Sequence, residues 1–148
     1  RGRRVRMFIS PYIVVFVLAW IIAQGTKYVL QLHKNRATSF KTIITESGGM
    51  PSSHSAVVIA VTTLIMMKEG LASPTFGLAL TFAMIVIYDS MKVRYSTGQQ
   101  SIAINKIIDQ QKLKVPKLRV VKGHTPLEVA VGSSLGLIIG YLAFILGL

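Results

Sequence analysis

The sequence predicts an all-α fold, an integral membrane helical bundle with about four spanning helices, a re-entrant glycine-rich turn and an interfacial helix. Hydrophobic residues make up 51% of the chain and charged residues only 15%, well below the roughly 25% that is usual in soluble proteins. The apolar residues fall in long blocks, and about 20 such residues cross the hydrocarbon core as a helix. At 148 residues the chain has room for one domain, so residues 1–148 are expected to form a single membrane-embedded domain.

The charge balance points to a phosphate-bearing partner. There are 17 basic and 5 acidic residues, which give a formal net charge of +12. A basic balance is also typical of nucleic-acid-binding proteins. Such proteins have no use for long apolar blocks, so we expect the lipid bilayer and a lipid phosphate as partners, and no nucleic acid. Cysteine is absent, which excludes a disulfide framework, a thiolate nucleophile and a cysteine metal site.

The first spanning helix is predicted over residues 8–23, with an extension over 24–32. Lys27 stands near its end, where a lysine can snorkel to the interface or face a site. Residues 31–46 are polar and basic and are expected to form a loop.

Two further helices follow this loop. Residues 53–67 are apolar but short for a full span, which suits a helix whose polar start is recessed into the protein. Gly70 is expected just after its end, as the C′ residue. Pro74 opens the third helix, which is apolar to residue 87.

The third helix is expected to end in Tyr88 and Asp89, an acid after an otherwise uncharged span. Such a residue indicates a functional site, with Arg94 as its candidate partner, although an ordinary interfacial salt bridge explains the pair equally well. Residues 96–123 are the most soluble part of the chain. Their isoleucines at 104, 107 and 108 share one helical face. This pattern slightly favours an interfacial amphipathic helix, and a partly disordered loop is nearly as good an interpretation.

The last span covers residues 125–148 and begins with a capping box, in which Thr125 is the N-cap and Glu128 the N3 residue. Small residues then recur every four positions, as Gly132, Gly136 and Gly140. This glycine ridge allows another helix to approach closely. It is predicted to be a packing surface, and it is also where two copies of the chain could associate.

The chain is organised around residues 48–56, Gly-Gly-Met-Pro-Ser-Ser-His-Ser-Ala. Gly48 and Gly49 loosen the backbone just before a helix start, where free N–H groups and the helix dipole favour an anion. Ser52 and Ser53 can either cap the helix or bind a ligand, and His54 can move a proton near neutral pH. Capping alone is a sufficient explanation for an isolated Ser-Ser-His sequence.

A second helix start also carries a histidine. His124 precedes the last helix, and Glu128 can turn back to bond a backbone N–H, His124 or both. Two histidines at two helix starts, with Lys27, Arg94 and other cations near helix ends, suggest a site for phosphoryl transfer. A histidine oriented by a carboxylate is a competent nucleophile and a second histidine can be the acid, so this chemistry requires no metal and no cofactor.

These motifs resemble a known family. Residues 51–54, Pro-Ser-Ser-His, resemble the Pro-Ser-Gly-His motif of the type 2 phosphatidic acid phosphatase superfamily, and residues 124–136 resemble its His-x-x-x-Asp motif, with Glu128 for the aspartate. The match is closer to the divergent bacterial and plastid branch of that superfamily. There Gly-Gly-Met-Pro-Ser-Ser-His-Ser-Ala, Tyr-Asp…Val-Arg…Gly-x-Gln and Gly-His-Thr-Pro-x-Glu-Val occur in the order found here.

The resemblance implies a role for each matched residue. His124 would be the nucleophile that forms a phosphohistidine, Glu128 would orient it, and His54 would protonate the leaving alkoxide. Phosphate oxygens would be held by Ser52, Ser53 and Lys27.

The chain departs from the superfamily pattern at its arginines. Lys34 stands where the first motif has an arginine, with Arg36 as an approximate substitute, and Leu118 stands where the third motif has one. Arg94, Arg119 or Lys122 could supply the missing charge, and the sequence does not choose among them. We take Arg94 and Lys122 as phosphate-binding candidates, with Asp89 and Gly49 as supporting residues.

The function expected from this resemblance is metal-independent hydrolysis of a lipid phosphate monoester or a polyprenyl (pyro)phosphate. A membrane protein that binds or moves a phospholipid through the same anion pocket is the alternative, and the missing arginines favour it. With four spans, 12 of the 17 basic residues lie on the site side of the membrane. The positive-inside rule then places the site on the cytoplasmic face, in a bacterial plasma membrane.

Overall fold

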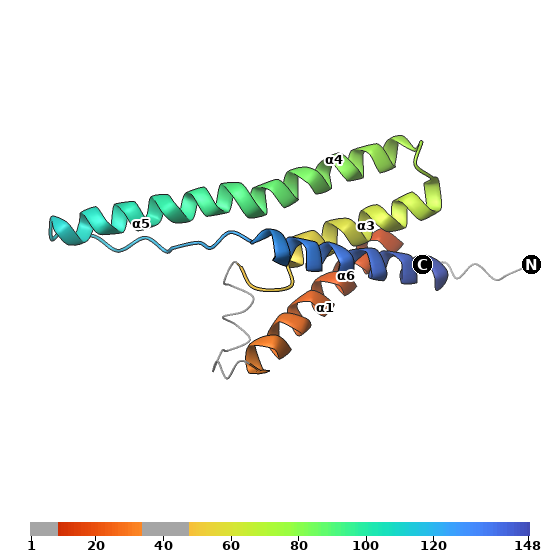
Figure 1. Cartoon of the computed structure of the whole chain (residues 1–148). Coiled ribbons are helices and arrows are strands. Elements are labelled where there is room, and N and C mark those ends of the chain that lie inside the picture. Colours follow the sequence, from red (N-terminus) through yellow and green to blue (C-terminus); the bar gives the residue numbers. More distant parts are fainter. Residues whose placement is uncertain (1–8, 34–47) are drawn as a thin grey trace, which may run out of the picture.

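The computed structural model describes residues 9–33 and 48–148, and these parts of the chain are helical, with no strand among them (Figure 1). Residues 1–8, with the expected helix start at residue 8, and residues 34–47, with Lys34 and Arg36, lie outside the described residues. An all-α fold is thus confirmed for the parts that the structure describes.

Helix α1 (Pro11–His33) extends the predicted first span to His33, so residues 31–33 are helical and not part of a loop. Its buried positions Val15, Ala19, Ala23 and Lys27 recur every four residues. This spacing places them on one face of the helix, so the face that packs against the bundle also carries Lys27.

Helices α3 (Ser53–Glu69) and α6 (Pro126–Ile145) form a parallel pair at the centre of the structure (Figure 1). A Cβ atom on Gly132, Gly136 or Gly140 would lie 2.4–2.5 Å from a backbone oxygen of α3 or its cap, so only glycine permits this approach. The predicted packing role of the glycine ridge is confirmed, with α3 of the same chain as its partner. Association of two copies through the ridge stays a prediction.

The third α-helix ends at Tyr88 with Asp89 as its C-cap, as predicted, but the chain does not leave the helical conformation there. Helix α4 (Pro74–Tyr88) continues through a π-helical turn, η1 (Asp89–Val93), into α5 (Arg94–Gln110). The widened turn is marked by the bond from the Arg94 N–H to the Asp89 carbonyl, five residues back. No proline interrupts residues 75–110, so charge at Asp89 alone does not stop the helix.

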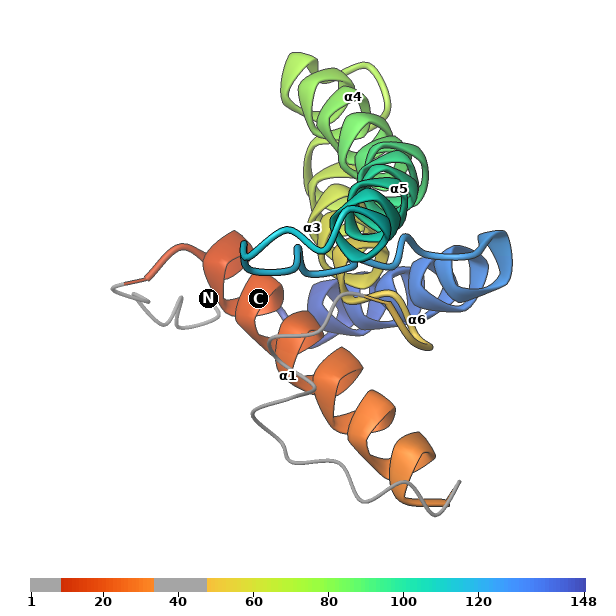
Figure 2. The ribbon, with the colours of Figure 1, turned by 90° about the vertical axis from the view of Figure 1, so that its left-hand side faces the viewer.

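Residues 112–125 return along α5 without helical structure (Figures 1 and 2). Asn105 fixes this return segment, because its side chain bonds the Leu118 carbonyl and N–H at 2.8 Å each. A Cβ atom on Gly98 would lie 2.1 Å from the Val121 carbonyl oxygen, so the segment packs directly on the helix. The predicted helix at residues 104–108 therefore exists within α5, and its placement at a membrane interface stays a prediction. The rest of the predicted soluble region is the return segment that packs on this helix.

Within the parts of the chain that the structure describes, three helices are long and apolar enough to cross a membrane: Pro11–His33, Pro74–Gln110 and Pro126–Ile145. Helix α3 has 17 residues and is shorter than these. Much of the apolar surface is exposed, including Leu78 at 72% and Met84 at 64%, which a surrounding lipid phase would cover. About four spans were expected, and the structure supports three by length and composition.

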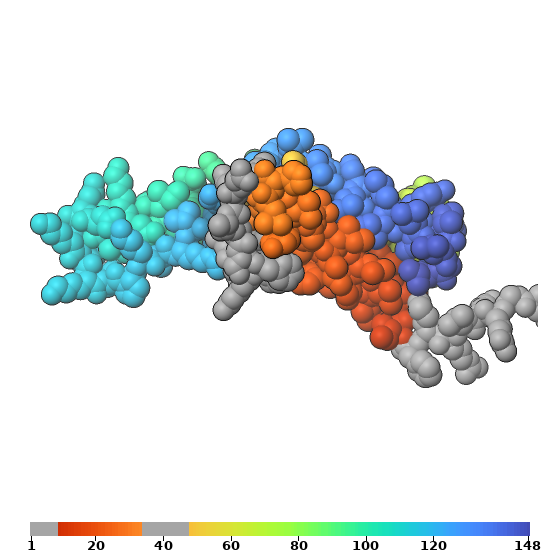
Figure 3. All heavy atoms as spheres, turned by 90° about the horizontal axis from the view of Figure 1, so that it is seen from below, coloured from red at the N-terminus to blue at the C-terminus, as the bar shows by residue number. Residues whose placement is uncertain are grey.

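The buried core is small and lies where α1, α3 and α6 meet, with Val15, Ala60, Leu64 and Ile139 among its members. Helices α1 and α6 lie side by side beneath α3, and the α5 arm extends beyond them (Figure 3). Helices α1 and α4 lie on different sides of α3 (Figure 2). A cavity is lined by residues of α1, α3 and α4 near the end where α3 begins.

Candidate functional site

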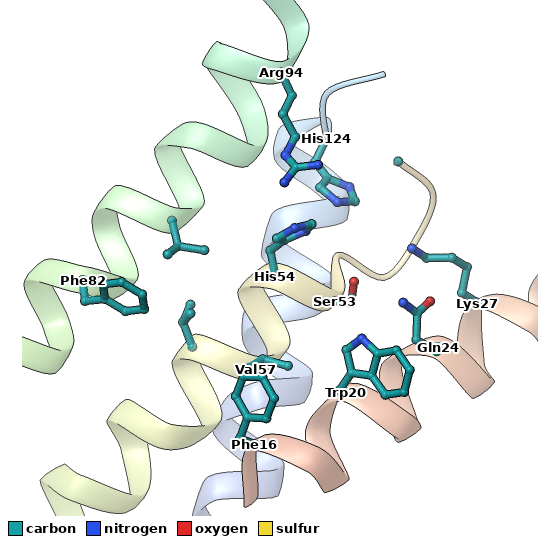
Figure 4. A pocket seen from close by; sticks show the side chains of 13 residues that line it. Phe16, Trp20, Gln24, Lys27, Ser53, His54, Val57, Phe82, Arg94 and His124 are labelled. Atoms are coloured by element: carbon teal, nitrogen blue, oxygen red, sulfur yellow. The ribbon is translucent and has the colours of Figure 1, made fainter. Parts of the chain in front are cut away.

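A cavity of about 410 Å³ lies between α1, the first turns of α3 and the second half of α4, and it is bounded by Arg94 at the start of α5 and by His124 just before α6 (Figure 4). Polar side chains line one end and apolar side chains the other. The lining residues are Phe16, Trp20, Gln24, Lys27, Gly48, Ser53, His54, Val57, Val58, Phe82, Val86, Arg94 and His124. The structure thus brings together both predicted histidines and two of the predicted cations.

The glycine-rich turn positions the start of α3. Gly48 and Gly49 have φ angles of 103° and 87°, a left-handed conformation that strongly favours glycine. Gly49 faces the stem of Lys27, whose Cδ would lie 3.6 Å from an added Cβ. The turn is joined to α6 by the Ser52 N–H, which donates to the Glu128 carbonyl at 3.0 Å.

The two serines of the motif have different positions. Ser52 is fully buried and caps α3, because its hydroxyl accepts hydrogen bonds from the Ser55 N–H at 3.3 Å and the Ser55 hydroxyl at 3.0 Å. The capping interpretation is therefore confirmed for Ser52, which is not among the lining residues. Ser53 does line the cavity and keeps its place as a phosphate-binding candidate.

His124 and Glu128 form a direct pair, as the sequence suggested. The Nδ1 atom of His124 lies 3.0 Å from Glu128 Oε2, which also accepts the Thr125 N–H at 3.1 Å. Glu128 and Thr125 complete the predicted capping box. Because an ionised carboxylate can only accept, Nδ1 carries the proton and Nε2 keeps a free lone pair.

The backbone around His124 is fixed by the η1 turn. The His124 N–H donates to the Ser90 carbonyl at 2.9 Å. Gly123 lies so close to η1 that an added Cβ would be 2.7 Å from the Met91 carbonyl oxygen. The unexpected continuation of α4 is therefore what holds the second histidine in place.

His54 faces His124 across the cavity, with ring centroids 5.7 Å apart and ring planes inclined by 64° (Figure 4). Its Nδ1 atom is buried and has no hydrogen-bond partner among the described residues. A buried nitrogen without a partner is uncommon in native proteins.

Lys27 and Arg94 supply positive charge at the polar end of the cavity. Lys27 is 3% exposed, and the Arg94 guanidinium approaches the Asp89 carboxylate at 3.5 Å, which confirms the predicted pair. Lys122 is exposed and lines a second cavity on the other side of His124. Of the three cations that the sequence could not rank, Arg94 is the one that lines the main cavity.

Burial lowers the pKa of His124, and the hydrogen bond and negative charge of Glu128 only partly oppose this effect. His124 is therefore neutral at neutral pH, as a nucleophilic imidazole must be. No group of three or more His, Cys, Asp or Glu side chains in the described parts of the chain could hold a metal ion.

Sequence reasoning missed the apolar half of the cavity and Gln24. The signal for Gln24 was present, since it is a polar residue inside an apolar span three positions before Lys27. Phe16, Trp20 and Phe82 gave no signal, because aromatic residues are common in any spanning helix. Their role depends on which helix faces are left uncovered between α1 and α4.

Comparison of the sequence with known proteins identifies the family of this chain. Residues 8–139 match the family described as the Divergent PAP2 family. The chain is also 34% identical over 136 residues to the uncharacterized membrane protein YuiD of Bacillus subtilis (strain 168), covering 82% of this chain and 85% of that protein. No solved structure gives a significant match.

Proposed function

This chain belongs to the Divergent PAP2 family, and on that basis we propose that it is a membrane phosphatase that hydrolyses a lipid phosphate through a phosphohistidine intermediate. The observation that carries this proposal is the 3.0 Å bond between His124 Nδ1 and Glu128. It leaves Nε2 as the nucleophilic atom of a side chain that lines a cavity with two cations.

In the proposed first step, His124 Nε2 attacks phosphorus and forms the N–P bond while the P–O bond to the alcohol breaks. Lys27 and Arg94 stabilise the charge on the phosphoryl oxygens, and Ser53 and the first N–H groups of α3 add hydrogen bonds. His54 acts as the acid in its imidazolium form and gives that proton to the leaving alkoxide. Burial and the neighbouring Arg94, His124 and Lys27 lower the pKa of His54 to about 4, so the negative charge of the bound phosphate has to stabilise the imidazolium form. Glu128 accepts a hydrogen bond from the His124 N–H throughout and stabilises the positive charge that develops on the ring.

In the second step, His54 accepts a proton from water as the water oxygen attacks the phosphohistidine. The N–P bond breaks, inorganic phosphate forms and His124 returns to its neutral state. The 5.7 Å separation of the two rings suits this scheme, because both imidazoles must reach atoms bound to the same phosphorus.

The shape of the cavity supports a substrate with an apolar chain. From the polar end, the lining continues to Phe16, Trp20 and Phe82. A neighbouring apolar cavity of about 120 Å³ shares Phe16, Val57, Val58 and Phe82 with it and reaches further between α1 and α4. A phosphate monoester or polyprenyl (pyro)phosphate can place its charged group at the histidines and its chain along α3.

The proposal is tested by phosphate release from a panel of lipid phosphates, using the detergent-purified chain with and without a chelator. We expect release that persists in chelator and is inhibited by orthovanadate, and no release from the His124→Ala variant. Activity that needed added magnesium would contradict the metal-independent mechanism. Saturable lipid binding without any release would instead support the non-hydrolytic alternative.

We also propose that the site faces the cytoplasm, because most basic residues belong to the segments on the same side of the membrane as the site. Ala72, in the turn between α3 and α4, and Lys112, at the end of α5, lie at opposite ends of the structure (Figure 1). Single cysteines at these positions should react differently with an impermeant maleimide in intact cells. Labelling at 72 without labelling at 112 supports the orientation, and the reverse pattern overturns it.

A further inference from the structure

The return segment runs back along α5 and η1 to the proposed nucleophile (Figure 1). It meets this continuous helix at three levels, each of which joins one helix residue to one residue of the segment. The three pairs are Asn105 with Leu118, Gly98 with Val121, and Ser90 with His124. The contacts therefore form a series that begins far out on α5 and ends at the site.

Between the outermost and the innermost contact, the segment is close to its full length. Six residues lead from Leu118 to His124, and a fully extended chain of that length spans about 20–22 Å. On the helix, fifteen residues lead from Ser90 to Asn105, which is a rise of about 22 Å. The middle contact agrees with this match, because it lies three extended residues and seven helical residues from the outermost one, about 10 Å in each case. The segment therefore has almost no slack.

Asn105 is the outer anchor of this extended part. Its side-chain NH₂ donates to the Leu118 carbonyl and its side-chain oxygen accepts the Leu118 N–H, at 2.8 Å each. Two bonds to the same residue fix both the position and the rotation of the backbone there. Further out, Lys117 is paired with Asp109 at 2.8 Å, but both side chains are more than half exposed, and such an ion pair contributes little. Loss of the Asn105 side chain would therefore release the segment.

We propose that Asn105 is a positioning residue, which holds the extended segment in register and thereby fixes His124 relative to the phosphate-binding side chains. This inference rests on the proposed phosphatase function, in which His124 Nε2 must lie within attacking distance of phosphorus. A displacement of about 1 Å from such a geometry can lower a rate by about a hundredfold. Asn105 acts from about 20 Å away along the helix, because a chain without slack cannot shift at one end without moving the other.

The variant Asn105→Ala removes both bonds to Leu118 and tests the proposal on the detergent-purified chain. We expect kcat for lipid phosphate hydrolysis to fall at least about tenfold, with KM within about twofold of wild type, because the side chains that bind phosphate lie outside the segment. Gln100→Ala is the matched control, since the Gln100 side chain is exposed on the same helix and bonds only Ser96 of that helix among the described residues. It should keep the wild-type kcat. An unchanged kcat in Asn105→Ala, or a rise in KM alone, would overturn the proposal.

Two insertions test the role of the segment's length. One additional glycine between Arg119 and Val120 lies between the anchors and adds about 3.3 Å of slack. The same insertion between Lys114 and Val115 lies outside the anchors. We expect the inner insertion to lower kcat at least about tenfold and the outer insertion to change it less than about twofold. Equal effects of the two insertions would contradict the proposal.

Hydrogen exchange separates this inference from the proposed function. The His124 N–H donates to the Ser90 carbonyl, and its exchange with deuterium can be followed by NMR on the detergent-solubilised chain. Exchange should be at least about tenfold faster in Asn105→Ala than in wild type or Gln100→Ala. That result supports the role of Asn105 even if wild-type protein releases no phosphate and the proposed function is wrong. Unchanged exchange would overturn this role, whatever the activity.

Discussion

The two ends of α3 carry polar groups of similar kinds in very different surroundings. At its C-terminal end, Glu69 accepts hydrogen bonds from the Tyr12 hydroxyl at 3.0 Å and the Ser73 hydroxyl at 2.8 Å. Ser73 also caps α4 by accepting the Thr75 and Phe76 N–H groups. These groups are exposed or half-buried, and both carboxylate oxygens of Glu69 have a partner within the chain.

At the N-terminal end of α3 the polar groups are buried, and several lack partners. Among the described residues, Gln24 Oε1 and His54 Nδ1 are buried without a hydrogen-bond partner, and both side chains line the cavity. Arg94 Nε makes no hydrogen bond and has the 3.5 Å ion pair with Asp89. Polar contacts within the chain pair the groups at the far end, whereas buried polar atoms without a hydrogen-bond partner lie at the cavity end. The Gln31 oxygen, further along α1 and outside the cavity, is also buried without a partner, so the position in the cavity, and not unpaired burial alone, distinguishes the two ends.

The largest effect is expected from His124→Ala, which removes the proposed nucleophile. Phosphate release should fall by about a thousandfold or more, because the remaining side chains can only bind and polarise the ester. Release is measured on detergent-purified protein, and circular dichroism checks that the helices remain. A variant that hydrolysed lipid phosphate at the wild-type rate would show that His124 has another role.

Lys27→Met is expected to lower kcat/KM by about a hundredfold, because it removes a buried cation that stabilises charge in the transition state of the proposed reaction. Methionine keeps much of the lysine stem that packs on Gly49. The matched control is Lys68→Met at the far end, where the lysine ammonium lies 5.7 Å from the Tyr12 ring centroid. If both lysine variants lost activity equally, the difference between the two ends would not concern catalysis.

A smaller effect is expected on the pH dependence. Neutral His124 is the reactive form, so kcat/KM should fall as the pH drops below its pKa, which burial holds below the ordinary value of 6.5. Glu128→Gln removes the interactions that raise this pKa. Although the rate falls overall, the acid limb of the profile should move to lower pH, as a series of rate measurements would show. A shift to higher pH would contradict the assigned pair.

The sequence predicted those parts of the site that depend on local spacing. The capping box at Thr125 and Glu128 and the contact of Glu128 with His124 each join residues three or four positions apart. The glycine ridge likewise follows from a spacing of four, although its partner α3 does not. For such features the helix period alone determines which side chains meet.

Features that depend on long-range contacts could not be predicted in this way. The helix continues past Asp89 as a π turn, and its Ser90 carbonyl is paired with an N–H from 34 positions later, at His124. The choice of Arg94 over Lys122, and of Ser53 over Ser52, depends on which side of a packed helix faces the cavity. Charge and residue type identified the candidates, but they could not predict which of them line the cavity.

The smallest effect is expected at the far end of α3, from Glu69→Ala. This variant removes the shared acceptor of Tyr12 and Ser73, and because both bonds are exposed, water replaces them at little cost. The melting temperature should fall by only a few degrees, and kcat/KM should stay within about twofold of wild type. Thermal unfolding and phosphate release, measured on the same preparation, check both parts. Hydrogen bonds at this end join α1 to α3 and α3 to α4, so a strong loss of activity would mean that the distant ends of α3 are coupled. In that case the cavity would depend on the relative positions of α1 and α4, rather than on the side chains that line it alone.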